Sequence, residues 1–150
     1  MTTTETNATH ARTAGVAAWI GLALTLIVGV VPFLEPATQV LTDHIRSGYP
    51  GYTEAEVDDA VGTWQIVLTV LSVLGVLAWA WTIRSVRTAR WSTTALFTVA
   101  VCIALALHTL RDTSGEVGLA PALAWLWTLP CVAGAAVTVA TWRRCAPDAS

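Results

Sequence analysis

The segment VGTWQIVLTVLSVLGVLAWAWTI, residues 61–83, decides the fold because it is predominantly apolar and carries no formal charge. A helix of about 20 apolar residues is long enough to cross the hydrocarbon core of a bilayer. Lipid offers its backbone no other hydrogen-bond partners, which favours a helix. Residues 13–34, 91–110 and 118–142 have the same apolar character. The sequence therefore predicts an all-α fold, an integral membrane four-helix bundle.

The composition agrees with this prediction. Hydrophobic residues make up 55% of the 150 residues and charged residues 12%, which is about half the share found in soluble domains. The net charge of −2 does not favour a nucleic-acid partner. Cys102, Cys131 and Cys145 form no close pair, so we expect no disulfide framework. The first apolar run is longer than a usual signal-peptide core, and we expect it to remain as a helix.

The placement of the arginines predicts an orientation. Most of them fall on one side of a four-span chain: Arg12, Arg84, Arg87, Arg90, Arg143 and Arg144. Arg46 and Arg111 fall on the other side. Because Arg-rich ends and loops stay in the cytoplasm, we expect a protein of the cell membrane with both termini cytoplasmic. We expect residues 1–12 and 143–150 to be disordered tails.

The tryptophans favour the same placement. Indole rings prefer the membrane interfaces, where the polar edge stays wet. The predicted inner boundary has Trp79, Trp81, Trp91 and Trp142 nearby, and the outer one has Trp64, Trp125 and Trp127. We therefore favour two interfacial belts over a ligand site built from tryptophans.

The link between the first two spans, residues 35–60, is long and predicts two helical pieces. Pro36 suits a first helical turn, and Val40, Leu41, His44 and Ile45 then share one face. This pattern predicts a short amphipathic helix on the outer membrane surface. Residues 48–52, GYPGY, are typical of a turn.

A second helix is predicted to begin at Thr53, because Thr53 and Glu56 have the spacing of a capping box. Acidic residues follow in its first turns, where the positive end of the helix dipole favours them. Asp58 and Asp59 raise the alternative of a cation site, but calcium loops use an irregular backbone. We favour a solvated acidic helix start that continues into the second span.

Small residues predict close helix packing. They include Gly15, Ala18, Gly21, Thr25 and Gly29 in the first span, Ser72 and Gly75 in the second, and Gly134, Ala135 and Thr138 in the fourth. They suit either the bundle itself or a contact between copies of the chain. Pro130, near the middle of the fourth span, predicts a kink because it lacks an N–H.

The functional hypotheses concern the outer face. Its candidate contact residues are His44, Tyr49, Tyr52, Asp58, His108, Arg111 and Asp112. His108 and Asp112 are four residues apart and suit one helix face. No spacing is typical of a catalytic, metal or cofactor site, so we expect no enzyme activity, metal or cofactor.

Two functions remain on these observations. The leading hypothesis is a non-catalytic accessory or interaction protein, and the alternative is an oligomeric passive transporter or channel for a small solute. The expected partners are the lipid bilayer and either a foreign protein or further copies of the chain, with no nucleic acid.

Overall fold

The computed structural model describes residues 3–85, 90–111 and 118–143, with side chains over 12–85, 91–111 and 118–143. Apart from the connecting turns, these ranges are helical. The expected all-α class is therefore confirmed for the described part of the chain. Asp112, one of the candidate contact residues, lies outside it.

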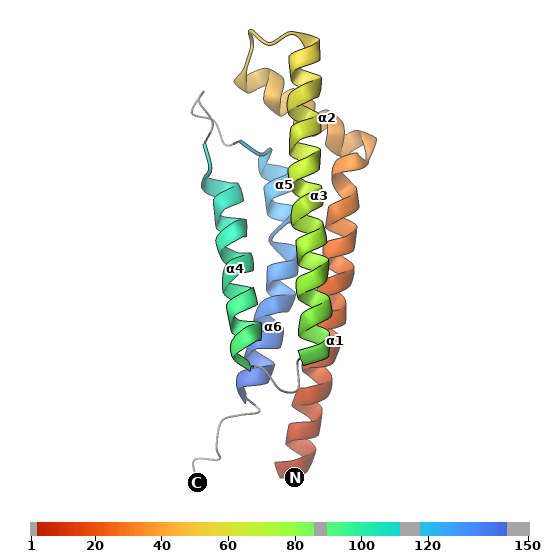
Figure 1. Cartoon of the computed structure of the whole chain (residues 1–150), viewed down its shortest axis with the longest axis vertical. Helices are drawn as coiled ribbons and strands as arrows, with labels where there is room; N and C mark the ends of the chain where they lie inside the picture. The colour runs from red at the N-terminus through yellow and green to blue at the C-terminus, as the bar shows by residue number, and fades with distance from the viewer. Residues whose placement is uncertain (1–2, 86–89, 112–117, 144–150) are drawn as a thin grey trace.

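The longer helices run up and down the long axis of the molecule, and the helical segment 35–48 crosses obliquely at one end (Figure 1). In chain order they are α1 (Thr3–Val30), the 3₁₀ helix η1 (Val31–Phe33), α2 (Glu35–Gly48), α3 (Glu54–Ser85), α4 (Arg90–Thr109), α5 (Pro121–Leu126) and α6 (Leu129–Arg143). Within the described residues, four segments are long and apolar enough to cross a membrane: Arg12–Phe33, Glu54–Ser85, Trp91–Thr109 and Pro121–Arg143. The start of α1 and the end of α6 share one end of the molecule, here called the terminal end (Figure 1).

The first helix differs from the expected span at both ends. It begins at Thr3, so it includes most of the segment for which we expected disorder. Extending an existing helix costs less than starting one, because each added residue brings a hydrogen bond. The helix stops at Val30 rather than Leu34, since Pro32 has no N–H and its ring crowds the preceding turn.

The carbonyl of Pro32 fixes the turn from α1 into α2. It accepts a hydrogen bond from Thr38 Oγ1 at 3.1 Å and another from Gln65 Nε2 of α3 at 3.0 Å. Gln65 is a polar residue within the apolar segment 61–83. Its amide therefore ties the α1–α2 turn to α3 instead of facing an apolar surrounding without a partner.

The fourth apolar segment is interrupted and forms two helices rather than the single span 118–142. Pro130 has no N–H for the carbonyl four residues earlier, and the interruption between Leu126 and Leu129 lies in that preceding turn. Thr128 bridges it by donating its backbone N–H and its hydroxyl to the carbonyl of Trp125, at 3.1 and 2.6 Å. The break thus occurs where Pro130 predicts a kink.

The small residues of α1 and α3 bring these two helices together. A Cβ added at Gly21 would overlap the indole ring of Trp79. The same ring donates its Nε1–H to Thr25 Oγ1 at 2.9 Å, and Thr25 donates to the carbonyl of Gly21 at 2.9 Å. Further along, a Cβ at Gly29 would lie 2.5 Å from Ser72 Oγ. Without side chains at Gly21 and Gly29, the helices approach closely.

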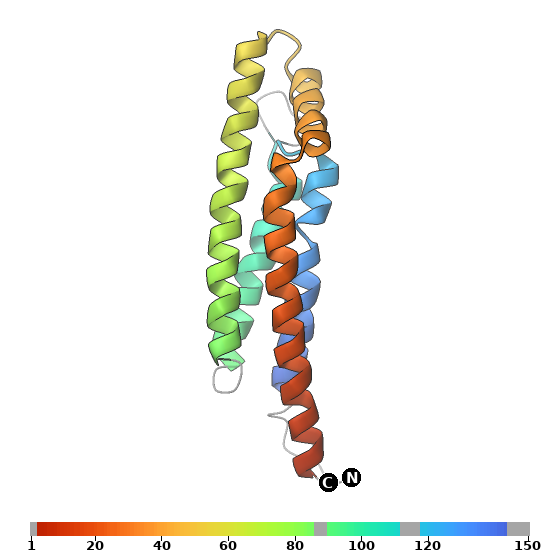
Figure 2. The ribbon, with the colours of Figure 1, turned by 90° about the vertical axis from the view of Figure 1, so that its right-hand side faces the viewer.

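Two further contacts join the remaining helices. Ala14 and Ala18 of α1 are buried with Val137 and Ala140 of α6, which places α1 between α3 and α6 (Figure 2). A Cβ at Gly134 of α6 would lie 2.8 Å from Phe97 of α4. The small residues Gly21, Gly29 and Gly134 therefore let helices of the same chain pack closely. Gly15 differs, because nothing lies within 4 Å of a Cβ added there.

Two tryptophans depart from the predicted interfacial belts. Trp79 packs between α1 and α3, where Thr25 rather than water accepts its N–H. Trp64 packs on the core at the other end of the bundle, 3.1 Å from a Cβ built at Gly118. Belt positions fit the more exposed rings better, namely Trp19, Trp81, Trp91 and Trp125.

Candidate functional site

The end of the molecule opposite the terminal end is a packed unit, here called the cap. It consists of α2, residues 49–53, the first turns of α3 and residues 118–124. Leu41 and Ile45 of α2, Val57 and Val61 of α3, and Leu119 share its buried core. Because the core holds these pieces together, the cap has a fixed surface rather than a loose loop.

The buried face of α2 differs from the expected one. Val40 is 44% exposed, and Ala37 is buried in its place. Ala37, Leu41 and Ile45 form a stripe with i, i+4, i+8 spacing. This stripe packs on α3 and on residues 119–124, so the helix rests on protein rather than lying apolar face down on a membrane surface as predicted.

The predicted capping box at the start of α3 is confirmed. Glu56 Oε2 accepts the backbone N–H of Thr53 at 2.7 Å and its hydroxyl at 2.8 Å, and Glu56 N–H points back to Thr53 Oγ1 at 3.4 Å. Both bonds stabilise the carboxylate and lower the pKa of Glu56. The bond from the Thr53 backbone N–H has the larger effect, and the bond from the Thr53 hydroxyl has the smaller one. The box therefore stabilises the cap above the unfolded-state pKa of Glu56 and loses this effect as the pH falls through the folded-state pKa.

Replacing Thr53 by alanine tests this account. The variant loses the hydroxyl donor but keeps the backbone donor, so we expect the pKa of Glu56 to rise part of the way to its ordinary value. NMR titration of the Glu56 carboxyl carbon in micelles measures this. Thr63→Ala, which removes a hydroxyl bonded to the Asp59 carbonyl, is the control and leaves the pKa of Glu56 unchanged. An unchanged pKa in Thr53→Ala contradicts the assigned cause.

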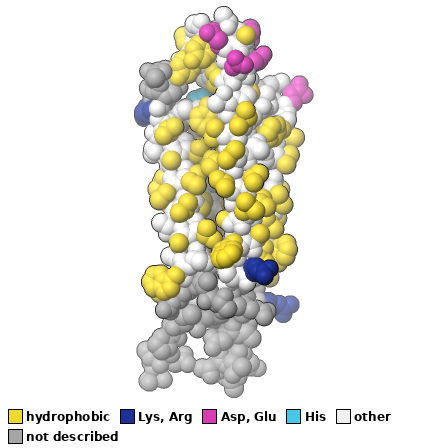
Figure 3. All heavy atoms as spheres, viewed as in Figure 1, with side chains coloured by type: hydrophobic (Ala, Val, Ile, Leu, Met, Phe, Trp, Pro, Cys, Tyr) yellow, Lys and Arg dark blue, Asp and Glu magenta, His cyan; other side chains and the backbone are white. Residues whose placement is uncertain are grey.

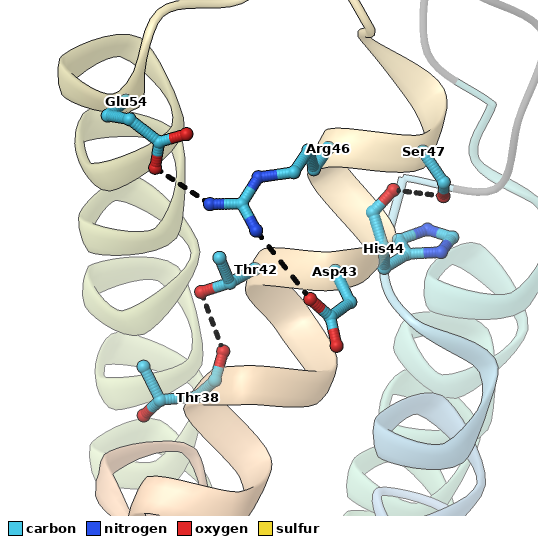
Figure 4. Close-up of polar contacts among 7 residues, drawn as sticks. All are labelled: Thr38, Thr42, Asp43, His44, Arg46, Ser47 and Glu54. Atoms are coloured by element: carbon cyan, nitrogen blue, oxygen red, sulfur yellow. Dashed lines mark hydrogen bonds and ion pairs between the residues drawn. The ribbon is translucent and has the colours of Figure 1, made fainter.

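A charged contact joins α2 to α3 on the surface of the cap (Figure 4). Arg46 donates to Glu54 Oε2 at 2.7 Å and lies 3.9 Å from Asp43 Oδ1. These side chains are at least half exposed, and exposed ion pairs contribute little to stability. The network orients acidic side chains on the surface, and the buried core holds the cap together.

Three of the candidate contact residues meet at a hollow in the cap. His44, Tyr49 and Tyr52 line this cap hollow of about 160 Å³ together with Trp64 and Gly118. The rings of Tyr49 and Tyr52 stack with their centroids 4.5 Å apart and their planes 14° from parallel. The stack fixes two aromatic faces at the rim, and Tyr52 remains 42% exposed.

Five lining residues of the cap hollow were not among the candidate contact residues, and Trp64 and Gly118 are two of them. Trp64 follows the buried Val57 and Val61 on one face of α3, so its helical spacing was a usable signal. Gly118 comes from a distant part of the chain, and its sequence neighbourhood carries no such signal.

The remaining described candidates do not line the cap hollow. Asp58 is exposed on the first turns of α3, and Arg111 is exposed after the end of α4. His108 Nδ1 lies 2.8 Å from the Ala104 carbonyl, so Nδ1 carries the proton, and Nε2 is buried with no hydrogen-bond partner. Its ring packs edge to face against the ring of Trp125, with the two ring centroids 5.0 Å apart.

Within residues 3–85, 90–111 and 118–143, no three His, Cys, Asp or Glu side chains are placed to hold a metal ion.

A larger cavity lies between α3, α4 and α6. It has a volume of about 360 Å³ and is here called the central cavity, and its walls include Phe97, Trp127, Pro130 and Cys131. Its lining is largely apolar, which favours an apolar filling.

Comparisons with protein-family models, with curated proteins and with solved structures found no match to this chain.

Proposed function

We propose that the chain is a multi-pass protein of the cell membrane with both termini in the cytoplasm and the cap outside. The four long apolar segments support insertion. Ile27, Ile66 and Leu77 are each at least 60% exposed on their outward faces, and soluble proteins rarely leave wide apolar surfaces in water. Arg84 and Arg143 lie in the last turns of their helices at the terminal end, which supports the orientation.

We further propose that the protein is a non-catalytic interaction protein whose cap binds a protein partner. The observation that carries this proposal is the cap hollow with its stacked Tyr49 and Tyr52 rim. Fixed aromatic side chains beside a small pocket are typical of the energetic centre of a protein interface. They contribute contact area at little cost in conformational entropy.

The charge around the cap indicates the chemistry of the partner. Glu54, Asp58 and Asp59 are exposed on α3, and acidic side chains gather at the upper end of the molecule in Figure 3. A basic side chain of a partner fits this surface, because the tyrosine faces attract cations and the carboxylates steer them. The central cavity, with its largely apolar lining, gives a hydrated solute few partners, which favours the interaction role over passive transport.

A photo-crosslinking amino acid at position 52 tests the partner role in intact cells. We expect one discrete protein adduct, which weakens when Asp58 and Asp59 are both changed to asparagine. The same crosslinker at position 66, on the exposed face of α3, is the matched control and does not form this adduct. If both positions give the same adducts, or if position 52 gives none, the cap does not bind a partner. A homo-oligomer that conducts solute into liposomes supports passive transport instead.

A further inference from the structure

We propose that the central cavity between α3, α4 and α6 holds one hydrocarbon chain of a membrane phospholipid, which enters sideways between α3 and α4. The inference rests on the membrane location proposed above and is independent of the partner role of the cap.

The central cavity opens toward the side of the bundle. Leu74 of α3 and Val99 of α4 both line it, and they are 54% and 56% exposed. The opposite wall includes Gly134 and Val137 of α6, which are buried. A cavity with exposed residues at one rim and buried residues at the far wall is a pocket whose mouth faces the surroundings of the bundle. In a membrane, those surroundings are acyl chains.

Three threonine hydroxyls and one indole N–H of the lining already donate to partners within the chain. Thr25, Thr82 and Thr138 donate their hydroxyl protons to the carbonyls of Gly21, Ala78 and Gly134 in their own helices, at 2.8–2.9 Å. Trp79 donates its N–H to Thr25. Buried water needs two to four polar partners, roughly three on average. These groups leave few donors for water or for a polar ligand, so the ligand that fits is a hydrocarbon.

The volume of the central cavity and the positive charges near it favour a phospholipid chain over other hydrocarbons. An apolar cavity of about 150 Å³ holds benzene, and this one has 360 Å³, which suits a longer ligand. Thr82 lines it two residues before Arg84, and Arg143 ends α6 on the same side of the molecule. A lipid of the leaflet at the terminal end would therefore place its phosphate at the level of two exposed arginines.

Photolabelling in nanodiscs tests the proposal. The probe is a phosphatidylglycerol that carries a diazirine in the middle of one acyl chain, and adducts are mapped by mass spectrometry. Cys131 reports on the central cavity because it lines it, and Cys102 is exposed on α4 and reports on bulk lipid. We expect adducts at both. Ala104→Phe fills the cavity from α4, whereas Ala106→Phe adds the same ring to an exposed position on the same helix.

The two variants distinguish lipid in the central cavity from bulk lipid. We expect Ala104→Phe to lose most of the adduct at Cys131 and to keep the adduct at Cys102, while Ala106→Phe keeps both. If Ala104→Phe does not fold, Ala100→Phe fills the central cavity from one turn earlier. Adducts at Cys102 alone, or cavity adducts that survive both filling variants, overturn the inference and leave the membrane location intact. A chain with no adduct at either cysteine overturns both, and labelling of Cys131 by a water-soluble maleimide shows an aqueous cavity and overturns the inference.

Discussion

Replacing Gly21 by alanine is expected to destabilise the protein by about 1–3 kcal/mol, the usual cost of overpacking a tight contact. The added methyl group would overlap the Trp79 ring. The ring cannot move away freely, because its N–H is bonded to Thr25 at 2.9 Å. The helices α1 and α3 must therefore separate or the bond must break. Thermal unfolding in a mild detergent, followed by circular dichroism, measures the loss.

Gly15→Ala is the matched control on the same helix. Nothing lies within 4 Å of a Cβ at Gly15, so alanine there adds no clash and favours the helix by roughly 0.5–1 kcal/mol. The two variants make the same chemical change and are expected to shift the unfolding temperature in opposite directions. Equal shifts would mean that α1 and α3 are not in contact through Gly21, and the arrangement of these two helices would be wrong.

Replacing Leu41 by alanine is expected to loosen the cap by about 2–5 kcal/mol, the cost of removing a buried leucine side chain. Leu41 is fully buried in the core shared by α2, α3 and Leu119. Leu41 itself lies on α2, outside the four apolar segments, so we expect water to reach its site when this core opens and the hydrophobic cost to apply. Hydrogen exchange of the α2 backbone amides measures the loosening directly.

Val40→Ala is the control because Val40 is the neighbour of Leu41 on α2 and is 44% exposed. We expect its effect to stay within about 0.5 kcal/mol, as for most surface positions. The pair also bears on function, since loss of the packed cap in Leu41→Ala is expected to abolish the crosslink from position 52. A crosslink that persists in Leu41→Ala would show that the partner does not need the folded cap.

Local signals in the sequence predicted several features well. Thr53 and Glu56 predicted the capping box, and the structure shows its bonds. The turn predicted for residues 48–52 follows the end of α2 at Gly48, and Pro130 predicted the disturbance of the fourth segment. Each of these features depends on backbone chemistry within one or two turns. That is why the neighbouring residues were sufficient.

Features that depend on helix rotation were predicted less well. The sequence pattern of α2 predicted a buried face that includes Val40. In the structure Val40 is exposed, and Ala37 is buried instead. Trp79 was assigned to a membrane interface, and it packs against Gly21. His44, Tyr49 and Tyr52 were predicted only as contact residues of the outer face; the structure brings them together at the cap hollow with Trp64 and Gly118, which were not among the candidates.

The sequence by itself determined the helical class, the four apolar segments, the disturbance at Pro130 and the capping box of α3, because hydrophobic length, missing N–H groups and capping side chains act locally. The tertiary structure decided which small residues meet, where the central cavity forms and what surrounds the cap hollow. The physical reason is that a helix apolar on every face has no preferred side. The rotation of such a helix about its axis, and the choice of its neighbours, are fixed only when its glycines pack against large side chains of another helix.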